Sequence, residues 1–306
     1  MNVKAHTIQL LKNTGFIFAL ALILGVSFGQ GAQLVKPLVT PLLALIMTTS
    51  LLGISLRTFA EFRKLPIFIV ISVLLNYIVL GGTFIGLSHV LVQDYDLLVG
   101  FVLIAAVPPA VAVIPFTYRL KGNIDVSLVG ALAAYLAALV FTPIISIVFT
   151  GVNVIQPYQV ILTVGELIIA PIVLALVLRR MGLAHRVEKF RSYIVNWGFF
   201  IVVYIIVGLN RDIFLTDFNT LLMLSIVSFI ATFGLTFVID YVSRKFNIDK
   251  PTRISLILLG TRKNYGLAGA LALTFFGAKA ALPTGVAIAF AIMNFIFLTF
   301  WVKRME

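Results

Sequence analysis

A pair of adjacent cations, Arg262 and Lys263, lies deep inside a long apolar stretch, with Gly260 and Gly266 on either side. If this stretch spans a membrane, a charge near its middle costs roughly 2.5–3.5 kcal/mol on insertion scales, and such residues mark ion or substrate pathways. The glycines allow the helix to unwind beside the charges. The pair is neutralised either by other protein groups or by an anionic ligand. The candidate binding residues of this stretch are Arg262, Lys263, Asn264 and Tyr265.

Three prolines interrupt an earlier apolar stretch. Proline lacks a backbone N–H and clashes with the preceding helical turn, so carbonyl groups ahead of it lose their partners. In lipid, protein, water or a ligand must satisfy these carbonyls, and broken helices therefore border cavities where ions and substrates bind. A structural kink without a ligand is the alternative. The candidate binding residues of this stretch are Pro108, Pro109, Val113, Ile114 and Pro115.

Glu166 is the only acidic residue deep inside an apolar stretch. Three roles fit it: a protonated group held by its neighbours, the partner of Lys263, or a proton carrier. A metal site is not expected, because the chain has no cysteine and His6, His89 and His185 are far apart in the sequence. No cofactor is therefore expected.

The composition indicates a membrane protein. Hydrophobic residues make up 61% of the 306 residues and charged residues 11%, and the mean hydropathy is +1.13. A soluble domain would be about half apolar and a quarter charged. The net charge of +12 comes from Lys and Arg in short segments between apolar runs. This pattern orients membrane proteins and does not favour nucleic-acid binding.

The candidate residues must be positioned by apolar helices of about 20 residues, the length that crosses a bilayer. Ten spans are expected, near residues 15–29, 38–56, 66–90, 97–120, 126–149, 159–178, 194–209, 221–241, 254–276 and 282–302. Cleavage of the first run as a signal peptide is the alternative. Most Lys and Arg residues fall on one side of these spans. We therefore expect a multi-pass protein of the cell (inner) membrane with both termini in the cytoplasm.

Two five-helix halves, residues 1–150 and 151–306, are expected to form an inverted repeat. A unit with an odd number of spans must reverse its orientation when it is repeated. The fourth and ninth spans are interrupted at corresponding places, at the prolines and at Gly260–Gly266, as in transporters with paired broken helices. The predicted fold class is an all-α polytopic membrane protein of about ten transmembrane helices.

Four segments resemble the bile acid:sodium symporter family, and together they extend over most of the chain. They are Pro41–Met47, Tyr118–Asn123, Asn264–Ala268 and Ala280–Pro283. The superfamily also contains arsenite exporters and auxin-type carriers. The resemblance implies a core domain of spans three to five and eight to ten beside a panel domain of spans one, two, six and seven. Spans four and nine would cross at their breaks, and substrate would bind between the two domains.

The resemblance also implies two sodium ions beside the crossing, but this chain departs from the family at those sites. Positions that supply oxygen ligands in the family carry Val113, Ile114, Ala131 and Leu259 here. Tyr135 stands where the family has a threonine, and Lys263 stands where it has a glutamine. Asn76 falls on a polar sodium-site position, so a fragment of one site survives. Lys263 would supply a positive charge in place of sodium, and Asn76 and Glu166 are the candidate coupling residues.

The sequence therefore favours a secondary transporter of a small organic anion that works by alternating access and does not require sodium. Proton coupling and simple facilitation both stay open. A conventional sodium-coupled symporter is one alternative, and a channel-like passive pore is another. An enzyme is not expected, because Glu166 has no acidic partner at the same depth. The expected partners are the anionic substrate and the lipid bilayer, with no obligatory protein partner and no nucleic acid.

Overall fold

The computed structural model describes residues 14–52, 65–110, 112–151 and 157–305, and every element in these ranges is helical. Six helical segments of the described chain are long and apolar enough to cross a membrane. They are Gly29–Leu51, Pro66–Leu91, Ile124–Thr150, Ala184–Leu209, Phe218–Lys245 and Ala278–Arg304. An all-α membrane protein is therefore confirmed, whereas the ten spans and the inverted repeat stay predictions.

The described helices of the first half begin at a short apolar helix, α2. In chain order they are α2 (Thr14–Ser27), η1 (Gly29–Gly31), α3 (Ala32–Val35), η2 (Lys36–Leu38), α4 (Val39–Leu51), α6 (Pro66–Val73), the π-helix η3 (Leu74–Leu80), α7 (Gly81–Leu91), α8 (Tyr95–Ala106), α9 (Val113–Arg119) and α10 (Ile124–Thr150). The start of α8 is fixed by Asp94, whose carboxylate accepts hydrogen bonds from the backbone N–H groups of Asp96 and Leu97. Such N-caps satisfy donors that have no partner within the helix.

Every element in the described part of the second half is also helical. Its elements are α11 (Pro157–Arg180), α12 (Ala184–Leu209), α13 (Arg211–Thr216), α14 (Phe218–Phe229), the π-helix η4 (Ile230–Gly234), α15 (Leu235–Lys245), α16 (Lys250–Thr261), α17 (Tyr265–Phe275) and α18 (Ala278–Arg304). Asn264 caps α17 by accepting a hydrogen bond from the Leu267 N–H at 3.1 Å.

Both predicted interruptions are breaks in the structure. The expected fourth span is divided into α8, which ends at Ala106, and α9, which begins at Val113. The expected ninth is divided into α16, which ends at Thr261, and α17, which begins at Tyr265. Pro108 and Pro109 lie within the first break, whereas Pro115 is the third residue of α9, where a proline is tolerated. Each half-helix is too short to cross a bilayer alone.

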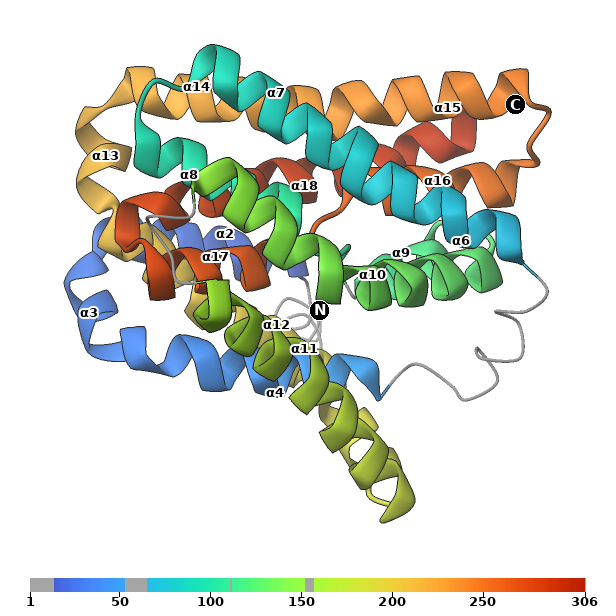
Figure 1. Ribbon diagram of the computed structural model, residues 1–306, viewed down its shortest axis with the longest axis horizontal. Helices are drawn as coiled ribbons and strands as arrows, with labels where there is room; N and C mark the ends of the chain where they lie inside the picture. Colours follow the sequence, from blue (N-terminus) through green and yellow to red (C-terminus); the bar gives the residue numbers. More distant parts are fainter. Residues whose placement is uncertain (1–13, 53–64, 111, 152–156, 306) are drawn as a thin grey trace, which may run out of the picture.

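Figure 1 shows α14 and α15 running as one long helix along the upper side of the molecule, with α4 and α12 on the lower side. The broken helices α8, α16 and α17 lie between these layers (Figure 1). All residues of α17 except the last two are buried, and α16 is buried from Thr252 onward. The break between α16 and α17 is therefore buried within the helix bundle.

Two π-helical segments interrupt the long helices beside the breaks. η3 lies between α6 and α7 and contains Asn76, and η4 lies between α14 and α15 and contains Thr232. Neither segment is predicted by the sequence pattern. A π-helix leaves backbone carbonyls without regular partners, and such segments are frequent at functional sites. Both segments supply acceptors or side chains to the site described below.

A close approach between α8 and α18 gives a stability test of this packing. A Cβ added at Gly100 would collide with the backbone carbonyl of Ala280, which cannot move aside as a side chain can, whereas a Cβ at Gly82 of α7 meets nothing within 4 Å. We expect Gly100→Ala to destabilise the protein by about 1–3 kcal/mol. Gly82→Ala should be neutral or slightly stabilising. Thermal unfolding in detergent compares the two variants, and equal melting temperatures would contradict the packing of α8 on α18.

Candidate functional site

The C-terminal end of α8 leaves a row of backbone carbonyls that the helix itself cannot pair. Helices end with unsatisfied carbonyls, and the missing N–H groups of Pro108 and Pro109 prevent the chain from continuing to pair them. Other segments supply the donors. The Thr142 hydroxyl of α10 donates to the Ala106 carbonyl at 2.8 Å, and the Asn264 N–H donates to the Pro108 carbonyl at 2.8 Å. The second of these bonds joins the two breaks directly.

Lys263 satisfies the remaining carbonyls of this row. Its ammonium donates to the Ala105 carbonyl at 2.7 Å, to the Val107 carbonyl at 2.9 Å and to the Asn76 Oδ1 atom at 2.8 Å. We call these three atoms the oxygen cage. The ammonium has three N–H donors, so the cage uses all of them. The Lys263 side chain is 0% exposed.

Electrostatics favours a cation at this position. The C-terminus of a helix carries a partial negative charge, and the cage lies at the C-terminus of α8. The Tyr77 ring centroid is 4.7 Å from the Lys263 nitrogen, which adds a cation–π contact. Tyr77 is itself held by a hydrogen bond from its hydroxyl to the Ala134 carbonyl at 2.8 Å. No carboxylate of the described chain forms an ion pair with Lys263.

Arg262 points to a different helix from its neighbour. Its guanidinium donates to the Ala291 carbonyl at 2.6 Å and to the Asn294 Oδ1 atom at 2.7 Å, both in α18. The Asn294 amide in turn donates to the Thr236 hydroxyl at 3.1 Å, in α15 and two residues after the end of η4. Arg262 is 2% exposed. The two cations therefore connect the break between α16 and α17 to α18 and to the end of α8.

Two buried polar atoms at the second break lack partners among the described residues. They are the Nε atom of Arg262 and the hydroxyl of Tyr265. Asn264 lies between these two residues in the sequence and has partners. Its amide nitrogen contacts the Tyr135 hydroxyl at 3.3 Å and the Met47 sulfur at 3.2 Å. Buried donors without a partner are rare in native structures and indicate a site for water or a ligand.

The other predicted site residues are distributed around this centre. Pro108, Pro109 and Val113 are buried, Ile114 is half-buried, and Pro115 is exposed. Tyr265 is buried at the start of α17. Glu166 lies on α11 with an exposed side chain and forms no ion pair with a described residue, so in this conformation it is not the partner of Lys263.

Sequence reasoning missed three contributors to this region. Thr142 and Asn294 are uncharged polar residues within apolar runs, and that pattern is the only signal that could have found them. Asp240 and Arg253 form a buried ion pair at 3.1 Å between α15 and α16. Arg244 also contacts Asp240, at 3.0 Å. This pair fixes α16 against the η4-containing helix.

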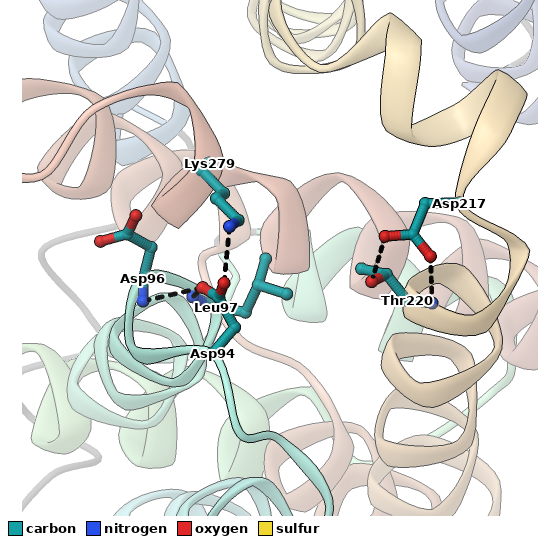
Figure 2. Close-up of polar contacts among 6 residues, drawn as sticks. All are labelled: Asp94, Asp96, Leu97, Asp217, Thr220 and Lys279. Atoms are coloured by element: carbon teal, nitrogen blue, oxygen red, sulfur yellow. Dashed lines mark hydrogen bonds and ion pairs between the residues drawn. The ribbon is translucent and has the colours of Figure 1, made fainter.

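A second polar cluster lies where α8 and α18 begin, at the opposite end of α8 from the break. Figure 2 shows the Lys279 ammonium directed at the Asp94 carboxylate, at 2.5 Å, with Asp96 and Asp217 nearby. Burial raises the pKa of Asp94, but the hydrogen bonds from Lys279 and from the Leu97 N–H outweigh it and hold the pKa below its ordinary value. Asp217 separately caps α14, and its carboxylate accepts hydrogen bonds from the hydroxyl and the backbone N–H of Thr220, which lower the pKa of its carboxyl.

Comparison with known proteins gives two findings. The model of the Sodium Bile acid symporter family matches residues 40–217. The chain is also similar to the "Uncharacterized sodium-dependent transporter YocS" of Bacillus subtilis (strain 168). The two are 24% identical over 290 residues, which cover 93% of this chain and 89% of that protein.

The Asp94–Lys279 pair predicts a pH effect on stability. A carboxyl whose folded pKa is depressed stabilises the fold above its unfolded pKa of about 3.9, and this contribution is lost as the pH falls through the folded value. The wild-type melting temperature should therefore decline as the pH is lowered from about 5 towards 3, and part of the decline should vanish in Asp94→Asn.

Asparagine keeps the helix cap of α8, so this variant removes the charge without removing the cap. Lys279→Gln should lose only the share that depends on Lys279, because the hydrogen bonds from the backbone N–H groups of Leu97 and Asp96 to the Asp94 carboxylate remain. An unchanged pH profile in both variants would show that the pair does not stabilise the fold.

Proposed function

Because the chain belongs to the Sodium Bile acid symporter family, we propose that it is a secondary transporter which moves a small organic anion across the cell membrane by alternating access. It crosses the membrane ten times: the six long segments, together with α2, α11 and the broken pairs α8–α9 and α16–α17. Residues 1–150 and 151–306 form inverted repeats. The breaks belong to a core domain, and substrate binds between this domain and a panel of the remaining helices.

The observation that carries the proposal is the position of Lys263. Transporters of this type coordinate sodium with the carbonyls of unwound helices and half-helix C-termini. Here the same kind of oxygen set, from Asn76, Ala105 and Val107, surrounds the Lys263 ammonium. A covalently attached cation in the oxygen cage removes the need for a bound sodium ion, so transport is sodium-independent.

The rest of the predicted sodium environment supports the same proposal. Val113, Ala131 and Leu259 are buried and have no side-chain oxygen to offer an ion. Tyr135 has a hydroxyl, but it accepts a hydrogen bond from the Asn264 amide. The Asn76 amide nitrogen lies 3.5 Å from the Leu259 carbonyl and 3.4 Å from the Arg262 carbonyl, which orients its oxygen towards Lys263.

Proton movement is the coupling reaction that fits a lysine. An ammonium that loses its oxygen partners when the helices rearrange can release a proton to water and regain it in the other state. A proton gradient would then take the place of a sodium gradient. Facilitated movement without coupling is the alternative, and it applies if Lys263 keeps its proton throughout the cycle.

An anionic substrate fits the charge of the site. Arg262 and Lys263 place two formal positive charges at one break, and no described carboxylate forms an ion pair with either. The unpaired Arg262 Nε and Tyr265 hydroxyl are donors that an anion oxygen could satisfy. The relative from Bacillus subtilis is named for sodium dependence, so sodium-coupled uptake of the same anion is the competing outcome.

Uptake into proteoliposomes tests the proposal. A labelled anion is first selected by a thermal-shift screen of organic anions on the purified protein. Its uptake should continue at a similar rate when choline replaces sodium on both sides, and an imposed proton gradient should change the rate. Uptake that vanishes without sodium and ignores the proton gradient would contradict the proposal.

The variant Lys263→Ala tests, in the same uptake experiment, whether the Lys263 ammonium is needed for transport. Truncation leaves the carbonyls of the oxygen cage without a cation, so uptake in choline should fall by about tenfold or more, the equivalent of roughly 1.4 kcal/mol. Sodium should restore part of the loss, because the emptied cage offers it oxygen ligands. Lys245→Ala is the matched control, since Lys245 is exposed at the end of α15. Loss of uptake in Lys263→Ala at an unchanged melting temperature separates transport from folding.

A further inference from the structure

The turn between α11 and α12 forms a helical hairpin that extends beyond the rest of the bundle (Figure 1). α11 ends at Arg180 and α12 begins at Ala184. The turn is tight: the Met181 N–H donates to the Val177 carbonyl at 2.9 Å, and Gly182 has a φ of +70° that favours glycine. We call the projecting end of this hairpin, around the turn, the tip. At its base, the Arg179 guanidinium donates to the Leu52 carbonyl at 2.7 Å.

Three cations of the tip are exposed and form no ion pair with a described residue. They are Arg180, Arg186 and Lys189. The one acid of the tip, Glu188, is 3.8 Å from Arg191, so it does not neutralise the three. The hairpin tip therefore presents uncompensated positive charge on a projecting surface.

Large apolar side chains are exposed on the same tip. Met181 is 64% exposed, Phe190 56%, Val173 51% and Leu174 50%. A helix rises about 1.5 Å per residue, so residues at equal distances from the turn lie at about the same distance from the tip. Val173 and Leu174 on α11 are thus level with Phe190 and Lys189 on α12. Apolar and cationic side chains occur at the same depth, where a purely aqueous loop would expose only polar groups.

We propose that the α11–α12 tip is a binding surface for anionic phospholipid, seated at the boundary between head groups and acyl chains. Met181, Phe190 and the exposed residues of α11 lie among the acyl chains, and Arg180, Arg186 and Lys189 bind head-group phosphates. Cations near an anionic surface bind it through charge attraction that neutral lipid cannot offer. Apolar side chains at that depth add a contribution that any bilayer provides. This proposal does not depend on the substrate or on the coupling ion.

Lipid binding to the full-length protein in detergent, measured by native mass spectrometry, tests the proposal. Phosphatidylglycerol should bind more tightly than phosphatidylcholine. In the triple variant Arg180→Gln, Arg186→Gln, Lys189→Gln, this preference should fall by about fivefold for each cation removed. The matched control is the triple variant Lys245→Gln, Lys303→Gln, Arg304→Gln, which removes the same charge from exposed residues at the ends of α15 and α18.

The control triple variant should keep most of the preference for phosphatidylglycerol. An equal loss in both triple variants would show that total charge, not the tip, selects the lipid, and would overturn the proposal. Equal binding of the two lipids by the wild type would also overturn it. Met181→Ser combined with Phe190→Ser should weaken both lipids by a similar factor, and a loss confined to phosphatidylglycerol would contradict the assigned depth of the tip.

Discussion

The unpaired carbonyls at the end of α8 constrain the centre of this protein. Four consecutive residues, from Ala105 to Pro108, each present a carbonyl that needs a donor from outside the helix, and each receives one. An unsatisfied carbonyl in an interior without water costs about 1–3 kcal/mol. The donors come from α10 and from the break between α16 and α17, so satisfying this row also brings three helical segments together.

Lys263 and Arg262 extend this constraint through the bundle. Adjacent residues in an extended segment point in opposite directions, and here one reaches the end of α8 while the other reaches α18. The π-helical segments η3 and η4 lie at the far ends of these contacts, through Asn76 and through Thr236 beyond η4. Any movement that separates Lys263 from its cage must expose a charge, three oxygen partners or both. The arrangement is therefore suited to two discrete states and not to gradual deformation.

The breaks were predictable from the sequence because proline and paired glycine alter local backbone geometry whatever surrounds them. The composition similarly determines the all-α membrane class. Asn76 was found only through the family resemblance, since a single asparagine in an apolar run does not reveal its partner. The roles of Thr142 and Asn294 and the two π-helical segments could not be predicted, because they depend on which helices meet. The position of Glu166 along a span likewise does not tell whether its side chain faces the interior or, as here, lies exposed.

The central claim is that the Lys263 ammonium occupies the place of a sodium ion. Direct binding of radioactive sodium to the purified protein, by scintillation proximity, tests this claim without any knowledge of the substrate. If the ammonium takes the place of sodium, the wild type should show no saturable sodium binding, and Lys263→Ala, in which the oxygens of Asn76, Ala105 and Val107 are released, should bind sodium measurably. Saturable binding of sodium to the wild type, unchanged in Lys263→Ala, would contradict it.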